Sequence, residues 1–166
     1  APLRPKPRIL EIAQDRLSEK DFLASIGVPT APYASATDIS SLAAALDRIG
    51  RPAFVKSARW GYDGKGQVKI DTVGDADSVW AKLSSWGGSS SLIVESAVDF
   101  DREISVIVAR GLDGQTVAYD AVENLHHEGI LLRTMAPALI PTALAAKAQA
   151  LAARIAVELD LVGILA

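Results

Sequence analysis

The sequence predicts an α+β fold built from two lobes, and two observations support this prediction. Of its 166 residues, 49% are hydrophobic, which is enough to bury a sizeable core. The predicted strands and helices also mix without the regular strand-helix alternation of a doubly wound parallel sheet. Two lobes that each combine strands with helices therefore explain the pattern better than a single parallel sheet.

Four segments show the spacing of apolar side chains that is typical of amphipathic helices. Glycines stand directly after the first two segments, at Gly27 and Gly50, where they favour helix ends. Thr37 or Asp38 precedes the second segment as a candidate N-cap. We expect helices at residues 14–26, 39–49, 75–86 and 142–159, the third of them ending at Gly87 and Gly88.

Short apolar runs between these segments predict strands. Gly111-Leu-Asp-Gly114 separates two of the runs, as in a β-hairpin. Three prolines among the first seven residues favour an extended connector at the N-terminus. Because the chain stops inside an apolar run, we expect it to be a fragment. The expected strands are residues 53–56, 68–70, 92–94, 103–109, 116–119 and 162–166.

Composition excludes several classes of protein. Lys and Arg number 17 against 20 for Asp and Glu, so there is no overall positive field to attract nucleic acid or an anionic membrane. The absence of cysteine excludes disulfides and thiolate metal sites. No segment approaches the ~20 apolar residues of a transmembrane helix, and no signal peptide begins the chain. We expect a cytoplasmic protein without nucleic-acid or membrane partners, in which any anion site is local.

The segment KSARWGYDGKGQ, residues 56–67, combines three glycines with three cations. Backbone amides of a glycine-rich segment can approach an anion closely, and phosphate is the natural candidate. The segment matches neither the Walker A motif nor G-x-G-x-x-G, and a strand follows it, so we expect it to bind as a flap. A protein-kinase flap has its lysine after the glycines, whereas Lys56 precedes them. The alternative is a solvated hairpin turn.

Lys56 favours the binding interpretation. It ends a strand that the sequence predicts to be buried, and an unpaired ammonium group is unfavourable there. We therefore expect Lys56 to have an anionic partner.

Further segments extend the pattern along the chain. They are Gln14-Asp-Arg16, Glu19-Lys20, Glu95, Glu103-Ile-Ser105, Ala109-Arg110, Glu123-Asn-Leu-His126 and Gly129-Ile130. Together with Lys56 and GYDGKGQ they resemble the 5-(carboxyamino)imidazole ribonucleotide synthases, ATP-grasp enzymes of purine biosynthesis, over residues 14–166. The resemblance implies an ATP-grasp fold of two α+β lobes that clamp ATP, truncated at both ends. It implies a connector from a missing N-terminal lobe at residues 1–13, a first lobe at 14–91 and the first part of a second lobe at 92–166.

The resemblance also implies roles for individual residues. Arg16 and Lys56 would contact the nucleotide phosphates and act in catalysis, which suits cations that form charge-assisted hydrogen bonds. Glu103 would accept the ribose hydroxyls, and His126 would lie near the nucleotide. Gly61, Tyr62, Asp63, Gly64, Lys65, Gly66 and Gln67 would cover the triphosphate, and Glu95, Ser96, Ala97 and Val98 would line the adenine with free backbone donors and acceptors.

Plainer interpretations of the same residues stay open. Glu95 could instead be a solvated carboxylate at the end of a strand. Arg16 could be an ordinary surface charge on a helix. Glu103 beside Arg102 is a candidate for a surface ion pair. His126 could be a structural histidine, and Tyr62 could either stack on an imidazole substrate or pack the flap.

The implied activity is that of an ADP-forming carbon-nitrogen ligase. It would carboxylate aminoimidazole ribonucleotide with bicarbonate through carboxyphosphate, with ATP and Mg²⁺ as cofactors and a homodimer as the assembly. No metal ligand is expected in this chain: the adjacent His126 and His127 would point to opposite faces of a strand, and the Mg²⁺ ligands are expected beyond Ala166. We expect little activity from the fragment alone. The alternatives are another ATP-grasp carboxylase or ligase with a different acceptor, and a non-catalytic nucleotide-binding module.

Overall fold

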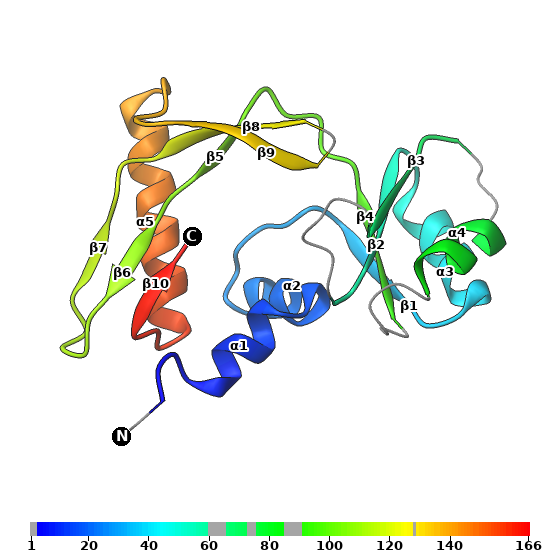
Figure 1. The fold of residues 1–166 in the computed structure, drawn as a ribbon, viewed down its shortest axis with the longest axis horizontal. Helices are drawn as coiled ribbons and strands as arrows, with labels where there is room; N and C mark the ends of the chain where they lie inside the picture. The colour runs from blue at the N-terminus through cyan, green and yellow to red at the C-terminus, as the bar shows by residue number, and fades with distance from the viewer. Residues whose placement is uncertain (1–2, 60–65, 73–75, 85–90, 128) are drawn as a thin grey trace. The chain divides into compact units, whose positions relative to one another are not determined.

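The computed structural model describes residues 3–59, 66–72, 76–84, 91–127 and 129–166. Its contacts divide the chain into two compact units (Figure 1). The N-terminal unit is Ile12–Asp99, and the C-terminal unit is Phe100–Ala166 together with Ala1–Glu11. Within the described ranges, no helix has both the length and the apolar character needed to cross a membrane.

The N-terminal unit contains a four-stranded antiparallel sheet with the strand order β1-β4-β2-β3. β4 therefore lies between β1 and β2, although it is the last of the four in the sequence. The strands are β1 (Tyr33–Ala36), β2 (Ala53–Ser57), β3 (Gln67–Ile70) and β4 (Leu92–Ser96), and the helices are α2 (Arg16–Ser25), α3 (Ile39–Ile49) and α4 (Ala76–Leu83).

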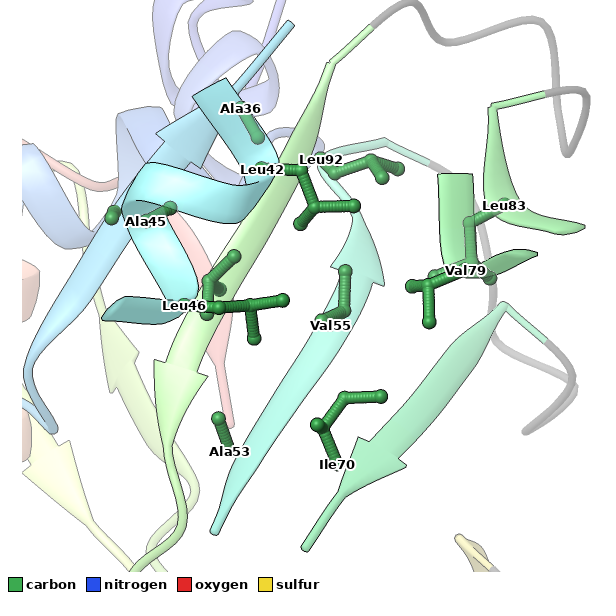
Figure 2. Packing of buried hydrophobic residues seen from close by; sticks show 12 residues of the cluster. Ala36, Leu42, Ala45, Leu46, Ala53, Val55, Ile70, Val79, Leu83 and Leu92 are labelled. Atoms are coloured by element: carbon green, nitrogen blue, oxygen red, sulfur yellow. The ribbon is translucent and has the colours of Figure 1, made fainter. Parts of the chain in front are cut away.

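One face of this sheet forms the core of the N-terminal unit. Figure 2 shows side chains of α3 and α4 packed over the strands, with Leu46 and Leu83 among those that are fully buried. Burying each large aliphatic side chain of this kind contributes about 1.5–3 kcal/mol. In β2 the buried side chains alternate, so Val55 points into the core while Phe54 and Lys56 point to the opposite face.

Local signals set the ends of the helices. Asp38 caps α3 through a hydrogen bond from the Ser41 backbone amide, and Gly50 ends the helix with a φ of 81°. Asp15 caps α2 in the same way, because its side chain accepts hydrogen bonds from the amides of Leu17 and Ser18. The predicted cap and terminator of α3 are confirmed.

The C-terminal unit contains two three-stranded antiparallel sheets and a long helix. The sheet orders are β10-β6-β7 and β5-β8-β9, and Ile9, Val108, Ala156 and Leu161 form a buried cluster in this unit. The elements are the first part of α1 (Pro7–Ala13), whose last two residues belong to the N-terminal unit, and β5 (Glu103–Ser105), β6 (Val108–Arg110), β7 (Thr116–Ala118), β8 (Val122–His127), β9 (Ile130–Met135), α5 (Thr142–Glu158) and β10 (Gly163–Leu165).

The α+β class is confirmed, and so are the helix at residues 39–49 and the hairpin turn between β6 and β7. The expected extended connector is wrong in part, because a helix begins at Pro7 and buries Ile9. Proline fits the first position of a helix, where its missing N–H group needs no partner. The proposed helix end at Gly87 and Gly88 lies outside the described residues.

Two long-range features also differ from the expectation. Residues 103–109 form two strands, β5 and β6, that belong to different sheets. The division between the units falls after Asp99 rather than after residue 91, because β4 pairs with β1 and β2 of the N-terminal sheet. Strand pairing, which one apolar run does not reveal, decides both points.

Candidate functional site

The pairing of β2 with β4 brings Lys56 and Glu95 together on the face opposite the core. Phe54 stands directly opposite Glu95, and Lys56 lies two residues further along the same face. Such a diagonal separation is within reach of long side chains. The Lys56 Nζ atom lies 2.6 Å from Glu95 Oε2, and the Glu95 side chain is only 11% exposed. The expected anionic partner of Lys56 is thus confirmed, and it is Glu95.

Lys20 provides a second ammonium group for the same carboxylate. Its Nζ atom lies 2.7 Å from Glu95 Oε1. The same atom lies 5.6 Å from the centre of the Tyr33 ring, close enough for a cation–π interaction. Each carboxylate oxygen of Glu95 therefore faces one lysine, and the three side chains, Lys20, Lys56 and Glu95, are named here the lysine cluster.

The lysine cluster keeps Glu95 ionised. Burial alone would raise the pKa of Glu95, but hydrogen bonds and charge from Lys20 and Lys56 together outweigh burial and hold the pKa below its ordinary value of 4.5. Two cations thus surround one anion at neutral pH. The interpretation of Glu95 as a solvated carboxylate is wrong, because the side chain is buried and paired.

Glu19 and Arg16 complete the charged surroundings of the cluster. Although Glu19 is exposed, loss of solvent around its carboxyl group raises its pKa, and the charge of Glu95 adds to this effect while Lys20 and Arg16 oppose it. With both carboxylates ionised, these three cations and two anions leave one surplus positive charge. Such a surplus attracts an anionic ligand at short range.

Hydrogen bonds hold Arg16 beside the end of β2. Its guanidinium donates to the Ser57 carbonyl at 2.9 Å, and its backbone amide donates to the Ala58 carbonyl at 2.9 Å. Asp15 adds an ion pair with Arg59 Nε at 2.9 Å. These contacts hold the N-terminus of α2 beside the start of the glycine-rich segment. Arg16 is therefore bound to the end of β2 and is not a free surface charge.

The glycine-rich segment is described only at its ends. Gly61, Tyr62, Asp63, Gly64 and Lys65 lie outside the described residues. Gly66 is buried, and its carbonyl accepts a hydrogen bond from the Ser57 amide at 3.1 Å. Gln67 begins β3 directly opposite Lys56. Both ends of the segment thus lie next to the lysine cluster.

The end of β4 corrects one expectation about the adenine. The Ser96 amide donates to the Pro32 carbonyl at 2.9 Å, and the Ala97 amide donates to the Pro52 carbonyl at 3.0 Å. These two donors are therefore occupied rather than free for a purine edge. Val98 is 57% exposed and keeps an apolar surface.

Glu103 and His126 lie together in the C-terminal unit. Glu103 is opposite Asn124 in the β5–β8 pairing, and His126 follows Asn124 on the same face. The His126 Nδ1 atom lies 2.9 Å from Glu103 Oε2, and both residues line a cavity of about 310 Å³. Arg102 pairs with Glu123 at 3.6 Å, so the expected alternative of an Arg102–Glu103 pair is not what forms.

The described residues contain no preformed cluster of metal-ligating side chains. Across the described ranges, no three His, Cys, Asp or Glu side chains gather closely enough to hold a metal ion.

Sequence reasoning missed Lys20 as a site residue. A usable signal was present, because Arg16 and Lys20 are four residues apart and so share one face of α2. Its partner Glu95 lies far away in the sequence, and no local pattern links the two.

The fold is α+β, with a cluster of charged side chains beside the ends of a glycine-rich segment, and comparison with known proteins identifies the class of protein. Residues 21–166 match the ATP-grasp domain family, and the chain belongs to that family.

Within this family, the chain is similar to enzymes that share one name. The N5-carboxyaminoimidazole ribonucleotide synthase of Brucella melitensis is 39% identical over 97% of this chain and 44% of its own length. The structure of the corresponding synthetase from Thermus thermophilus is 41% identical with a TM-score of 0.85, covering 98% of this chain and 43% of that one. A carboxyaminoimidazole ribonucleotide synthase from Aspergillus clavatus, complexed with ATP, is 26% identical with a TM-score of 0.85, covering 97% and 42%. This chain thus spans less than half the length of each of these relatives.

Proposed function

We propose that the chain is the nucleotide-binding part of an ADP-forming ligase that carboxylates 5-aminoimidazole ribonucleotide with bicarbonate. The product would be N5-carboxyaminoimidazole ribonucleotide, an intermediate of purine biosynthesis. The observation that carries the proposal is the lysine cluster, whose surplus positive charge lies beside both ends of the glycine-rich segment. The similarity to the synthases of Brucella melitensis and Thermus thermophilus supports the choice of substrate.

ATP is proposed as the ligand of the lysine cluster. Lys56 and Arg16 would neutralise charge on the nucleotide phosphates, and charge-assisted hydrogen bonds of this kind contribute about 1.5–3 kcal/mol each. The glycine-rich segment would cover the triphosphate. The Aspergillus clavatus relative, described as complexed with ATP, supports this assignment. Glu103, with His126 beside it, is proposed to accept the ribose hydroxyls.

The proposed reaction needs the protein to position the substrates, and it needs no covalent intermediate with the protein. Bicarbonate is unreactive, so ATP would first phosphorylate it to carboxyphosphate and leave as ADP. The exocyclic amine of aminoimidazole ribonucleotide would then attack the carboxyl carbon and release phosphate. Charge neutralisation at the phosphates and exclusion of water are the contributions that Lys56, Arg16 and the covering segment can make. Mg²⁺ is proposed to bind outside the described residues.

Turnover of the whole protein that contains this chain tests the proposal. We expect release of ADP and phosphate that requires both bicarbonate and aminoimidazole ribonucleotide. Lys56→Met should reduce the rate at limiting ATP by about tenfold or more, since it removes a charge-assisted bond. Lys82→Met, at an exposed lysine of α4, is the matched control and should behave as the wild type does.

The same assay separates the alternatives. Bicarbonate-dependent turnover with a different acceptor would identify another ATP-grasp carboxylase. ATP binding without turnover under any of these conditions would favour a non-catalytic module. We expect little turnover from the 166-residue chain alone, which spans less than half the length of its relatives.

A further inference from the structure

Lys20 makes one of the two ion pairs that Glu95 forms with described residues, although no role in the site was expected for it. We propose that Lys20 is a positioning residue that holds Glu95 so that Lys56 is free to bind a nucleotide phosphate. The proposal rests on the proposed function, from which it takes the role of Lys56. Its new content is that the phosphate affinity of Lys56 depends on a lysine of a different element, α2.

The burial of Glu95 is the first argument. Its side chain is 11% exposed, and a buried carboxylate that loses its only partner is strongly destabilised. If Lys56 were the only partner, its movement toward a phosphate would leave Glu95 unpaired. Lys20 keeps an ammonium group 2.7 Å from Glu95 Oε1, so Lys56 can leave while Glu95 stays paired.

The second argument is the difference between the two lysines. The Lys20 side chain is 16% exposed and lies over the ring of Tyr33, whose hydroxyl is held by Asp21 at 2.6 Å. Lys56 also lies 5.6 Å from the centre of an aromatic ring, that of Phe54, but it is 27% exposed and lies near the end of β2, next to the glycine-rich segment. Exposure and position therefore distinguish the two: Lys20 is the more buried partner of Glu95, and Lys56 is the more exposed one, which can reach a ligand.

Charge is the third argument. Lys56 and Glu95 alone form a neutral pair, which attracts an anion weakly. Lys20 balances the charge of Glu95, so the charge of Lys56 is not neutralised by Glu95 and is available to a phosphate. Removing Lys20 should thus leave Glu95 to neutralise Lys56, which weakens phosphate binding at Lys56 although Lys20 need not touch the nucleotide.

A double-mutant cycle on the whole protein tests this, with calorimetry of ATP binding as the measurement. Lys20→Met is expected to weaken ATP binding by about tenfold, and Lys20→Arg, which keeps the charge, should restore most of the affinity. In a Lys56→Met background, Lys20→Met should have no further effect, because it acts through Lys56. Lys82→Met is the matched control for the loss of one lysine charge.

Folding is monitored by circular dichroism, and Lys20→Gln replaces Lys20→Met if the methionine variant does not fold. Glutamine removes the charge but keeps a hydrogen-bond donor for Glu95 Oε1, so the same loss of affinity is expected. Additive losses in the double variant would overturn the positioning role, because they would mean that Lys20 acts independently of Lys56.

The outcomes also distinguish the two proposals. If Lys56→Met weakens ATP binding while both Lys20→Met and Lys20→Gln bind as tightly as the wild type, only the positioning role is overturned. If the wild type binds no ATP, or Lys56→Met binds it unchanged, the proposed function fails and the positioning role fails with it.

Discussion

Glu95 differs from the other acidic residues of the described chain in the burial of its ion pairs. Within the described ranges, only its pairs with Lys20 and Lys56 have both side chains less than one-third exposed. The Arg51–Asp47 pair, by contrast, spans 3.7 Å with Asp47 79% exposed. Exposed pairs of that kind contribute about 0–1 kcal/mol, whereas removing one partner of a buried pair costs about 3–5 kcal/mol.

This difference predicts the pH dependence of stability. The pKa of Glu95 is below 4.5 in the folded chain, so its contribution is present above about pH 4.5 and is lost as the pH falls through the folded-state pKa. Glu95→Gln should lower the free energy of unfolding at pH 7 by about 3 kcal/mol. Urea denaturation as a function of pH should also show a shallower acid-side decline for Glu95→Gln than for the wild type.

Asp47→Asn is the control for this measurement, because it removes one carboxylate of the same unit from an exposed pair. It should change the free energy of unfolding by less than about 1 kcal/mol. Equal effects of the two substitutions, or an unchanged acid-side slope in Glu95→Gln, would contradict the role given to the burial of Glu95.

At the scale of an element, α3 shows how local signals specify a helix. Asp38 begins it with a capping box, three side chains on one face enter the core, and Gly50 ends it. Gly50 has a φ of 81°, which disfavours any residue with a Cβ atom, yet a Cβ placed there would meet no atom within 4 Å. The glycine is therefore needed for its backbone conformation and not for space.

Gly50→Ala tests this explanation. We expect it to lower the free energy of unfolding of the 166-residue chain by about 1–3 kcal/mol, because alanine is strained at this backbone conformation. Ala44→Ser, at an exposed position of the same helix, should change it by less than about 0.5 kcal/mol. Urea denaturation of the three proteins measures both effects, and equal stability of Gly50→Ala and the wild type would count against the strain.

At the scale of the whole molecule, the larger core lies entirely within one unit. The twelve buried residues that pack around the four-stranded sheet all belong to Ile12–Asp99. The cluster of the C-terminal unit is smaller and includes Ile9 from the start of the chain. The core of the N-terminal unit is thus built from one continuous part of the chain, whereas that of the C-terminal unit needs residues from both ends of the chain.

We therefore expect residues 12–99, produced alone, to fold and to unfold cooperatively on heating. Leu46→Ala in this piece should lower its free energy of unfolding by about 2–5 kcal/mol, since Leu46 is fully buried. Circular dichroism during heating provides the measurement. A gradual transition in the unmutated piece, or no effect of Leu46→Ala, would show that the core needs the rest of the chain.

The site was predictable to a different degree in each part. Lys56 stood out because a cation followed an apolar run and preceded glycines, and its need for an anion was correctly inferred. The backbone donors of Ser96 and Ala97 were wrongly expected to be free, because their acceptors, Pro32 and Pro52, lie far away in the sequence. The assignments at residues 61–65 stay predictions, since these residues are not described.

The sequence by itself determined the α+β class and the bounds of α3, because caps, glycines and apolar spacing act within a few residues. Only the tertiary structure decided that β4 lies between β1 and β2, and that Lys20 and Lys56 share Glu95. Residues far apart in the chain meet only after strands pair and a helix packs over them. Local sequence patterns do not predict which strands pair.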